Sequence, residues 1–181
     1  MTTLRTSPYL LLLNDEVVAM VRAKNLIGWG SFSTVTTSSA TISTEPLKPP
    51  TVPYRGVDTS DVQIHVQWSP LTGDNTGQED ITGYDVEWDS GSNEATWYYL
   101  TSELTTFTYT YTQTSDISAG VAYHIRYRAI NLHGVGDWSD SGTIYATAKP
   151  DQLSPVLTTN SDVDVVTTWS PTPSDRGAVV T

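Results

Sequence analysis

The sequence is that of an acidic chain of 181 residues with a formal net charge of −11. Its nine Lys and Arg residues are too few for a nucleic-acid surface, because binding to phosphates depends on clustered cations that release counterions. The chain contains no cysteine, which excludes disulfide bonds and thiolate metal sites. Its aromatic residues are mostly Tyr and Trp, and long stretches are rich in Thr, Val and Ser, a composition typical of β-strands. We therefore predict an all-β fold.

The first apolar stretch, from Leu10 to Leu13, ends after four residues at Asn14, Asp15 and Glu16. It is too short for the apolar core of a signal peptide or for a membrane span. We therefore expect no membrane insertion within this segment, and we expect any secretion signal or anchor to lie outside it.

The chain repeats itself at an interval of about 100 residues. Residues 23–33 and residues 129–139 share the frame A-x-N-x-x-G-x-G-x-aromatic-S, at an interval of 106 residues. Trp68-Ser69-Pro70 recurs as Trp169-Ser170-Pro171 at an interval of 101, and Ile81-Thr82 matches Val180-Thr181 at an interval of 99. Three echoes at nearly one spacing predict a repeated module of that length.

Proline-rich stretches stand where such a period would place boundaries, at residues 45–50 and at Lys149-Pro150-Asp151. Strands are expected to end there, because proline removes backbone donors and stiffens a linker. The predicted organisation is one complete module over residues 46–150, preceded by part of a module over 1–45 and followed by part of another over 151–181.

Between the two proline-rich stretches, short alternating segments separated by turn residues predict seven strands, and hence a β-sandwich. The strands are expected near Thr51 to Tyr54, Val62 to Trp68, Gly83 to Asp89, Trp97 to Leu100, Thr105 to Tyr111, Ala122 to Asn131 and Ser141 to Ala148.

Alternation within two of these strands predicts which side chains face the core. The inward set is Val62, Ile64, Val66 and Trp68 in one strand, and Tyr123, Ile125, Tyr127 and Ala129 in the other. The outward set is Gln63, His65 and Gln67, with His124, Arg126 and Arg128.

These residues resemble the fibronectin type III family. The matching pattern is Pro49-Pro50, then Trp68-Ser69-Pro70 closing strand B, Ile81 to Trp88 as strand C, and the spaced residues from Gly120 to Ser139 across strands F and G. The resemblance implies tandem immunoglobulin-like sandwiches in which Trp68 fills the core and Tyr123 forms a tyrosine corner. We expect the structural core to contain Trp68, Tyr84, Trp88, Tyr123, Tyr127 and Trp138.

The resemblance extends to the flanking pieces, with residues 1–45 as strands E to G and residues 151–181 as strands A and B and the start of C. The first piece departs from the pattern, since Val17 aligns with Tyr123. Joining the tail of one chain to the head of the next would lack the equivalents of residues 83–106. Unpaired strand edges and open apolar faces would then invite pairing with another chain.

No catalytic, cofactor-binding or metal-binding residues are predicted. The three histidines, His65, His124 and His133, lack metal-ligand spacing, and no serine stands in a nucleophile motif. A loop containing Asp74, Asn75, Glu79 and Asp80 carries the oxygen ligands that calcium prefers, without the spacing of a calcium loop, and is interpreted as a solvated acidic loop.

Three further patterns bear on recognition. Arg55-Gly56-Val57 and Asp175-Arg176-Gly177 each share part of an integrin-binding tripeptide without completing it. Trp138-Ser139-Asp140-Ser141 resembles half of a cytokine-receptor box, and we expect Arg126 and Arg128 to stack with Trp138 as a stabilising ladder. N-linked glycans are not expected, whereas the hydroxyl-rich runs 34–44 and 105–114 offer sites for O-linked sugar.

The predicted function is that of a structural or adhesive repeat segment of an extracellular or cell-surface protein, without enzyme activity or cofactors. Its expected partners are other protein modules, including itself head to tail. One alternative is a fibre subunit whose partial end modules are completed by neighbouring protomers. Another is a set of accessory modules in a secreted carbohydrate-active enzyme.

Overall fold

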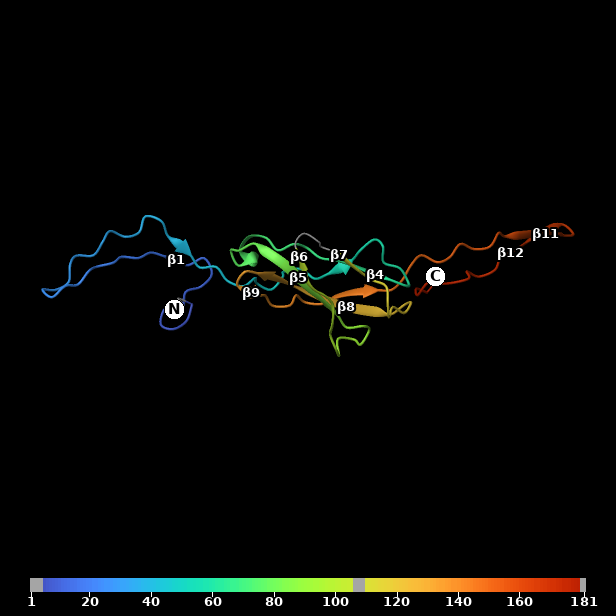
Figure 1. Ribbon diagram of the computed structural model, residues 1–181. Coiled ribbons are helices and arrows are strands. Elements are labelled where there is room, and N and C mark those ends of the chain that lie inside the picture. Colours follow the sequence, from blue (N-terminus) through green and yellow to red (C-terminus); the bar gives the residue numbers. More distant parts are fainter. Residues whose placement is uncertain (1–4, 106–109, 180–181) are drawn as a thin grey trace.

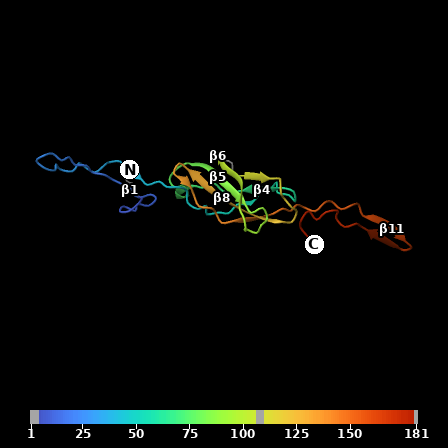
Figure 2. The same ribbon diagram turned by 60° about the horizontal axis from the view of Figure 1, so that its bottom comes forward.

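A computed structural model describes residues 5–105 and 110–179. Its centre is a two-layered β-sandwich, and one thin segment of chain extends from each end of that sandwich (Figure 1). Figure 2 shows the same arrangement from a second angle. Within the described residues, the only helix is a short 3-10 helix at Gly73–Thr76, and no helix has the length and hydropathy to cross a membrane.

The sandwich consists of two antiparallel sheets. The larger has the strand order β10-β8-β5-β6, with β9 also paired to β8, and the smaller has the order β3-β4-β7. The larger sheet is formed by β5 (Ile81–Trp88), β6 (Tyr98–Thr105), β8 (Ala122–Asn131), β9 (Gly134–Val135) and β10 (Gly142–Tyr145). The smaller sheet is formed by β3 (Tyr54–Arg55), β4 (Ile64–Gln67) and β7 (Thr110–Gln113). The predicted all-β sandwich is thus confirmed.

The core lies between the two sheets and is built around aromatic rings. Trp68, which follows β4, is 1% exposed, and its ring centroid lies 6.1 Å from those of both Tyr84 and Tyr127. At the other end of the core, Trp88 stacks on Tyr123 with centroids 5.2 Å apart. Trp68 follows a strand of the smaller sheet, whereas Tyr84 and Tyr127 belong to the larger one, so the contacts of the Trp68 ring hold the sheets together.

Strand β8 alternates strictly between buried and half-buried residues, as expected for a strand with one face in the core. Tyr123, Ile125, Tyr127 and Ala129 are all buried. Asn131 at its end is also buried, and its amide forms part of the site described below.

Strand β4 differs from its prediction at two positions. His65 is 8% exposed and not directed to water, because the turn after β3 folds over its ring: a Cβ on Gly56 would lie 2.3 Å from His65 Nδ1. Val62 was expected in the core and is 61% exposed, because β4 begins only at Ile64.

The predicted strand from Thr105 to Tyr111 is also wrong as a single element. Thr105 ends β6 in the larger sheet and Thr110 begins β7 in the smaller one, so the chain changes sheet between them. Residues 106–109 of that prediction lie outside the described residues.

Each flanking segment contains one pair of short strands. In the first, β1 (Glu16–Val17) pairs with β2 (Ala40–Thr41); in the second, β11 (Leu157–Ser161) pairs with β12 (Asp164–Thr168). Large apolar side chains remain exposed on both segments, among them Leu26, Ile27, Trp29, Val165 and Trp169.

Candidate functional site

Stacked aromatic and arginine side chains cover the outer face of the larger sheet. Arg126 of β8 lies with its guanidinium carbon 4.1 Å from the ring centroid of Trp97 and 4.8 Å from that of Trp138. Arg128 lies 4.3 Å from the Trp138 centroid and donates a hydrogen bond to the hydroxyl of Tyr99 at 3.0 Å. We call this set, Trp97, Tyr99, Arg126, Arg128 and Trp138, the aromatic–arginine ladder.

The ladder corrects the placement of Trp138, which is half-buried on the outer face and is not part of the core. It stands outside because it stacks on two arginines that point away from the core.

The charges of the ladder are balanced by two buried carboxylates on β5. Arg126 pairs with Glu87 at 2.7 Å and Arg128 with Asp85 at 2.8 Å. These carboxylates alternate with the inward residues of β5. The sequence would have indicated them as partners of the two arginines if β5 had been predicted to pair with β8. Because each cation has its own counterion, the ladder stabilises the sheet and offers little net charge to a ligand.

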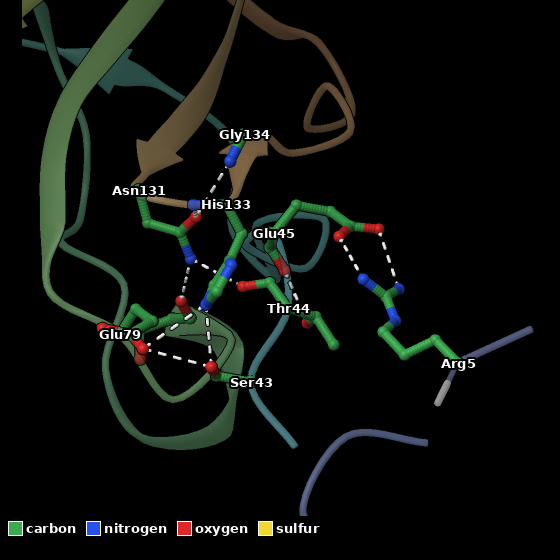
Figure 3. Close-up of polar contacts among 9 residues, drawn as sticks. Arg5, Ser43, Thr44, Glu45, Glu79, Asn131, His133 and Gly134 are labelled. Carbon is green, nitrogen blue, oxygen red and sulfur yellow. Dashed lines mark hydrogen bonds and ion pairs between the residues drawn. The ribbon is translucent and has the colours of Figure 1, made fainter. Parts of the chain in front are cut away.

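The chain enters the sandwich through a clamped linker, residues 43–48, which we call the incoming linker (Figure 3). The N–H of Thr44 donates to the carbonyl of Gly77 at 2.8 Å, and the N–H of Leu47 donates to the carbonyl of Asn75 at 3.0 Å. The linker and this loop approach so closely that a Cβ on Gly77 would lie 2.2 Å from the Thr44 carbonyl oxygen.

Asn131, at the end of β8, closes the clamp from the other side. Its amide Nδ2 donates to the carbonyls of Thr44 at 2.7 Å and Thr76 at 2.9 Å, while its Oδ1 accepts from the N–H groups of His133 at 2.8 Å and Gly134 at 3.2 Å (Figure 3). One buried side chain therefore joins the linker, the loop after β4 and the turn after β8.

Two groups of side-chain contacts, each including a carboxylate, lie next to the clamp. The His133 Nε2 atom lies 2.7 Å from Ser43 Oγ, which itself donates to Glu79 at 3.1 Å. Arg5 of the N-terminal segment makes a two-pronged contact with Glu45 at 2.9 and 3.2 Å. Hydrogen bonds from Arg5 lower the pKa of Glu45 to about 2.

A second joint lies where the chain leaves the sandwich, in the outgoing linker, residues 147–151. The N–H of Ala148 donates to the carbonyl of Arg176 at 3.1 Å, and the N–H of Asp151 donates to that of Ser174 at 3.3 Å. Gly177 abuts the sandwich, since a Cβ on it would lie 2.4 Å from the backbone nitrogen of Gly120.

An ion pair holds the same joint. The Arg176 guanidinium lies 3.1 Å from Asp61 Oδ1, an oxygen that is buried and that accepts no hydrogen bond within the described residues. Arg176 therefore compensates a charge that the sandwich itself leaves unpaired.

Each histidine considered in the sequence pairs with a carboxylate and not with another histidine. The pairs are His65–Asp58 at 3.4 Å, His124–Asp89 at 2.8 Å and His133–Glu79 at 3.4 Å. Among the described residues, no three His, Asp or Glu side chains gather in a way that would hold a metal ion.

The carboxylate of Asp89 is fully buried, and no motif in the sequence indicates its role. Burial by itself raises its pKa, but the N–H groups of Glu94, His124 and Gly91 donate to it and outweigh that effect, so its pKa is lowered. These bonds fix the loop after β5, which makes Asp89 a structural group.

The acidic loop before β5 is occupied by internal contacts. Asp74 accepts from Gln78 at 2.8 Å, Glu79 accepts from Ser43, and the Asn75 carbonyl accepts from the incoming linker. These oxygens of Asp74, Asn75 and Glu79 bind the protein's own donors, and no group of three ligands that could hold a metal ion occurs among the described residues.

The hydroxyl of Tyr123 ties β8 back to the preceding turn. It accepts from the N–H of Ser118 at 2.8 Å and donates to the carbonyl of Asp116 at 3.3 Å, which is the geometry of a tyrosine corner. The family model described as "Fibronectin type III domain" matches residues 48–145, more than half of the chain. The chain belongs to the fibronectin type III domain family.

Solved structures of fibronectin type III domains are similar to this chain. The chicken CNTN1 FN1-FN3 domains are 18% identical with a TM-score of 0.49, and the match covers 86% of this chain and 52% of that one. The fourth FNIII domain of a human protein is 22% identical, with a TM-score of 0.49 and coverages of 64% and 90%. The sixth such domain of human fibronectin type III domain containing protein 3 is 18% identical, with a TM-score of 0.44 and coverages of 66% and 98%. No curated protein matches the sequence.

Within this fibronectin type III fold, both incomplete integrin-like tripeptides have their arginines engaged. Arg55 donates to the backbone carbonyls of Thr59, Tyr145 and Thr147 at 2.6 to 2.9 Å. Arg176 holds the outgoing joint. Both guanidiniums therefore serve the fold and its joints.

Proposed function

We propose that this chain is a stretch of tandem fibronectin type III modules in an extracellular or cell-surface protein, where it acts as a spacer and as a protein-interaction module. The proposed modules are a complete one at 46–150, with parts of others at 1–45 and 151–181. Fibronectin type III domains are in general non-catalytic modules of adhesion and interaction proteins, and they often occur in extracellular proteins.

The observation that carries this proposal is that the two linkers are bonded alike. In the incoming linker, Thr44 and Leu47 donate to the carbonyls of Gly77 and Asn75. About 100 positions further along, Ala148 and Asp151 of the outgoing linker donate in the same way to the carbonyls of Arg176 and Ser174. A module boundary with the same main-chain bonding on both sides is what a tandem array requires.

The N-terminal segment repeats the last hairpin of the sandwich in the same way. The N–H of Ser33 donates to the Val21 carbonyl at 2.8 Å, and the N–H of Val21 donates to Ser33 Oγ at 3.1 Å. Ser139 and Tyr127 make the same two bonds at the same distances. Arg22 stacks on Phe32 at 4.6 Å, as Arg128 stacks on Trp138. This supports the assignment of the segment to strands F and G of another module.

The C-terminal segment repeats the first strand pair of the sandwich. Leu157 pairs with Thr168 in β11–β12, as Tyr54 pairs with Gln67 in β3–β4. Trp169 follows β12 as Trp68 follows β4, but it is 68% exposed because no second sheet covers it. This supports the assignment of the segment to strands A and B.

The exposed apolar side chains of both segments favour a second candidate, a fibre subunit in which neighbouring copies cover one another. For O-linked sugar, the hydroxyl-rich residues 34–41 are exposed and would be accessible to a transferase.

Single-molecule pulling on the full chain tests the spacer function. A mechanically stable module of the matched length should unfold in one event that lengthens the chain by roughly 300 Å, at about 3.4 Å per residue. Trp68→Ala, which empties the centre of the core, should remove the event. A wild-type chain that extends without any force peak would contradict the proposal.

A further inference from the structure

A turn in the N-terminal segment, residues 25–30, repeats the turn of the linker clamp bond for bond. Asn25 Oδ1 accepts from the N–H groups of Ile27 at 2.9 Å and Gly28 at 3.0 Å, as Asn131 Oδ1 accepts from His133 and Gly134. The N–H of Gly30 donates to the carbonyl of Ala23 at 2.9 Å. Its counterpart Gly136 donates to Ala129 at 3.0 Å. We call residues 25–30 the N-terminal turn.

The two turns differ in what their asparagines bind beyond the turn. Asn131 is 4% exposed, and its Nδ2 donates to two carbonyls of the incoming linker and its loop. Asn25 is exposed, and across residues 5–105 and 110–179 its Nδ2 donates to no acceptor. The N-terminal turn thus has the shape of the clamp without the segment that the clamp holds.

The glycines of the two turns show what kind of group is missing. A Cβ on Gly136 would lie 2.5 Å from the Pro46 carbonyl oxygen, so glycine is required there by a close backbone approach. A Cβ on Gly30 would meet only the Ala23 carbonyl oxygen at 3.7 Å, and Gly30 has no positive φ. Neither its conformation nor its described neighbours require glycine, whereas an approaching carbonyl, like that of Pro46, would.

The segment that fits this turn is present elsewhere in the same chain. Ala148 and Asp151 donate to the carbonyls of Arg176 and Ser174 as the incoming linker donates to its loop. We call residues 148–151 and 174–176 the C-terminal seat. By this correspondence the carbonyls of Ala148 and Asp175 stand where those of Thr44 and Thr76 stand in the clamp, and Pro150 stands where Pro46 does.

We propose that the N-terminal turn of one copy binds the C-terminal seat of a second copy, so that copies associate head to tail. Asn25 Nδ2 donates to the carbonyls of Ala148 and Asp175 of the other copy, and Gly30 lies against its Pro150 carbonyl. The inference rests on the tandem arrangement proposed above. Because the contact joins two different surfaces, it propagates without closing.

Apolar surface favours the same pairing, and charge does not oppose it. Residues 5–45 carry three cations and three carboxylates, in a chain that is strongly acidic overall, whereas residues 148–179 carry two cations and four carboxylates. Association would cover large apolar side chains that are exposed in the single chain: Trp29 and Phe32 on one copy, and Val165 and Trp169 on the other. The contact consists of two hydrogen bonds donated by Asn25 and four apolar side chains, so association is reversible and of moderate affinity.

Sedimentation equilibrium of the full chain tests the proposal. From about 1 µM to about 1 mM, the weight-average mass should rise continuously above that of one chain, as expected for an open association of moderate affinity. Gly30→Val should lower the association constant at least about tenfold, because its side chain occupies the place of the Pro150 carbonyl.

Two matched variants separate this contact from folding. Gly136→Val makes the same change in the occupied turn and should lower the melting temperature of the sandwich, whereas Gly30→Val should leave it unchanged. Ser31→Val adds the same side chain one residue further along, at the counterpart of the exposed Asp137, and should associate like the wild type.

A wild-type chain that stays monomeric over the whole range, or a Gly30→Val chain that associates as strongly as the wild type, would overturn the proposal. The pulling experiment depends on the sandwich alone, so failure of the head-to-tail contact leaves its force peak in place. Loss of that peak with association retained would instead count against the spacer function.

Discussion

Replacing Asn131 by alanine should uncouple the incoming linker from the sandwich. The substitution removes four hydrogen bonds of a side chain that is 4% exposed: two donated to the carbonyls of Thr44 and Thr76, and two accepted from the turn. At about 1 kcal/mol net for each bond, with part recovered by water at the exposed turn, the expected loss is about 2–4 kcal/mol. For a domain of this size, that corresponds to a fall in melting temperature of about 8–25 °C.

The assay is urea and thermal unfolding followed by tryptophan fluorescence, since Trp68 and Trp88 lie in the core. Asn25→Ala, measured at chain concentrations below the association range, is the matched control, because it alters the equivalent turn outside the sandwich and should change the free energy of unfolding by less than about 0.5 kcal/mol. If Asn131→Ala costs less than about 1 kcal/mol, or if the two variants cost the same, the linker clamp does not stabilise the sandwich in the way described.

Three further perturbations address other parts of the structure. The pKa of Glu45 is lowered in the folded chain, so the stabilisation from Arg5 is present above the ordinary carboxyl pKa of 4.5 and is lost as the pH falls through about 2. Glu45→Gln should remove this pH dependence of stability. An NMR titration of Glu45 with a midpoint near 4.5 would contradict the prediction. Gly177→Val should clash with the backbone of Gly120 and free the C-terminal segment, which 15N relaxation would detect as faster independent tumbling; unchanged relaxation would show that the joint does not hold the segment. Tyr123→Phe should cost about 1–3 kcal/mol in urea unfolding, because it removes both bonds of the tyrosine corner, and a neutral result would show that the corner bonds do not matter.

The sandwich was predictable because its long strands face the core on one side only. In β8 the alternation of Tyr123, Ile125 and Tyr127 with polar residues is complete, so the inward set follows from the period of a strand. Alternation says nothing of how the preceding turn folds, and this is why His65 and Val62 were placed on the wrong sides. It also cannot show where a chain leaves one sheet for the other, as it does between Thr105 and Thr110.

The site was predictable only in part. The ladder expected from Arg126, Arg128 and Trp138 is present, but Tyr99 joins it from β6 and Trp97 from the residue just before β6, a strand whose pairing next to β5 the sequence does not reveal. The frame A-x-N-x-x-G-x-G marked Asn131 and Gly136 as repeated residues, yet its physical reason, a turn that grips the incoming linker, depends on contacts between residues far apart in the sequence.

The proposed tandem arrangement has a consequence for how such chains evolve. At the two linkers, Thr44 corresponds to Ala148 and Gly77 to Arg176, and these pairs share no side-chain chemistry, yet the same N–H groups meet the same carbonyls. A junction made of peptide groups imposes few demands on residue type, so domains of this kind can be duplicated, reordered and allowed to diverge while their connections keep working. Selection then acts on the exposed faces that meet partners, and the coupling between neighbours is inherited with the backbone.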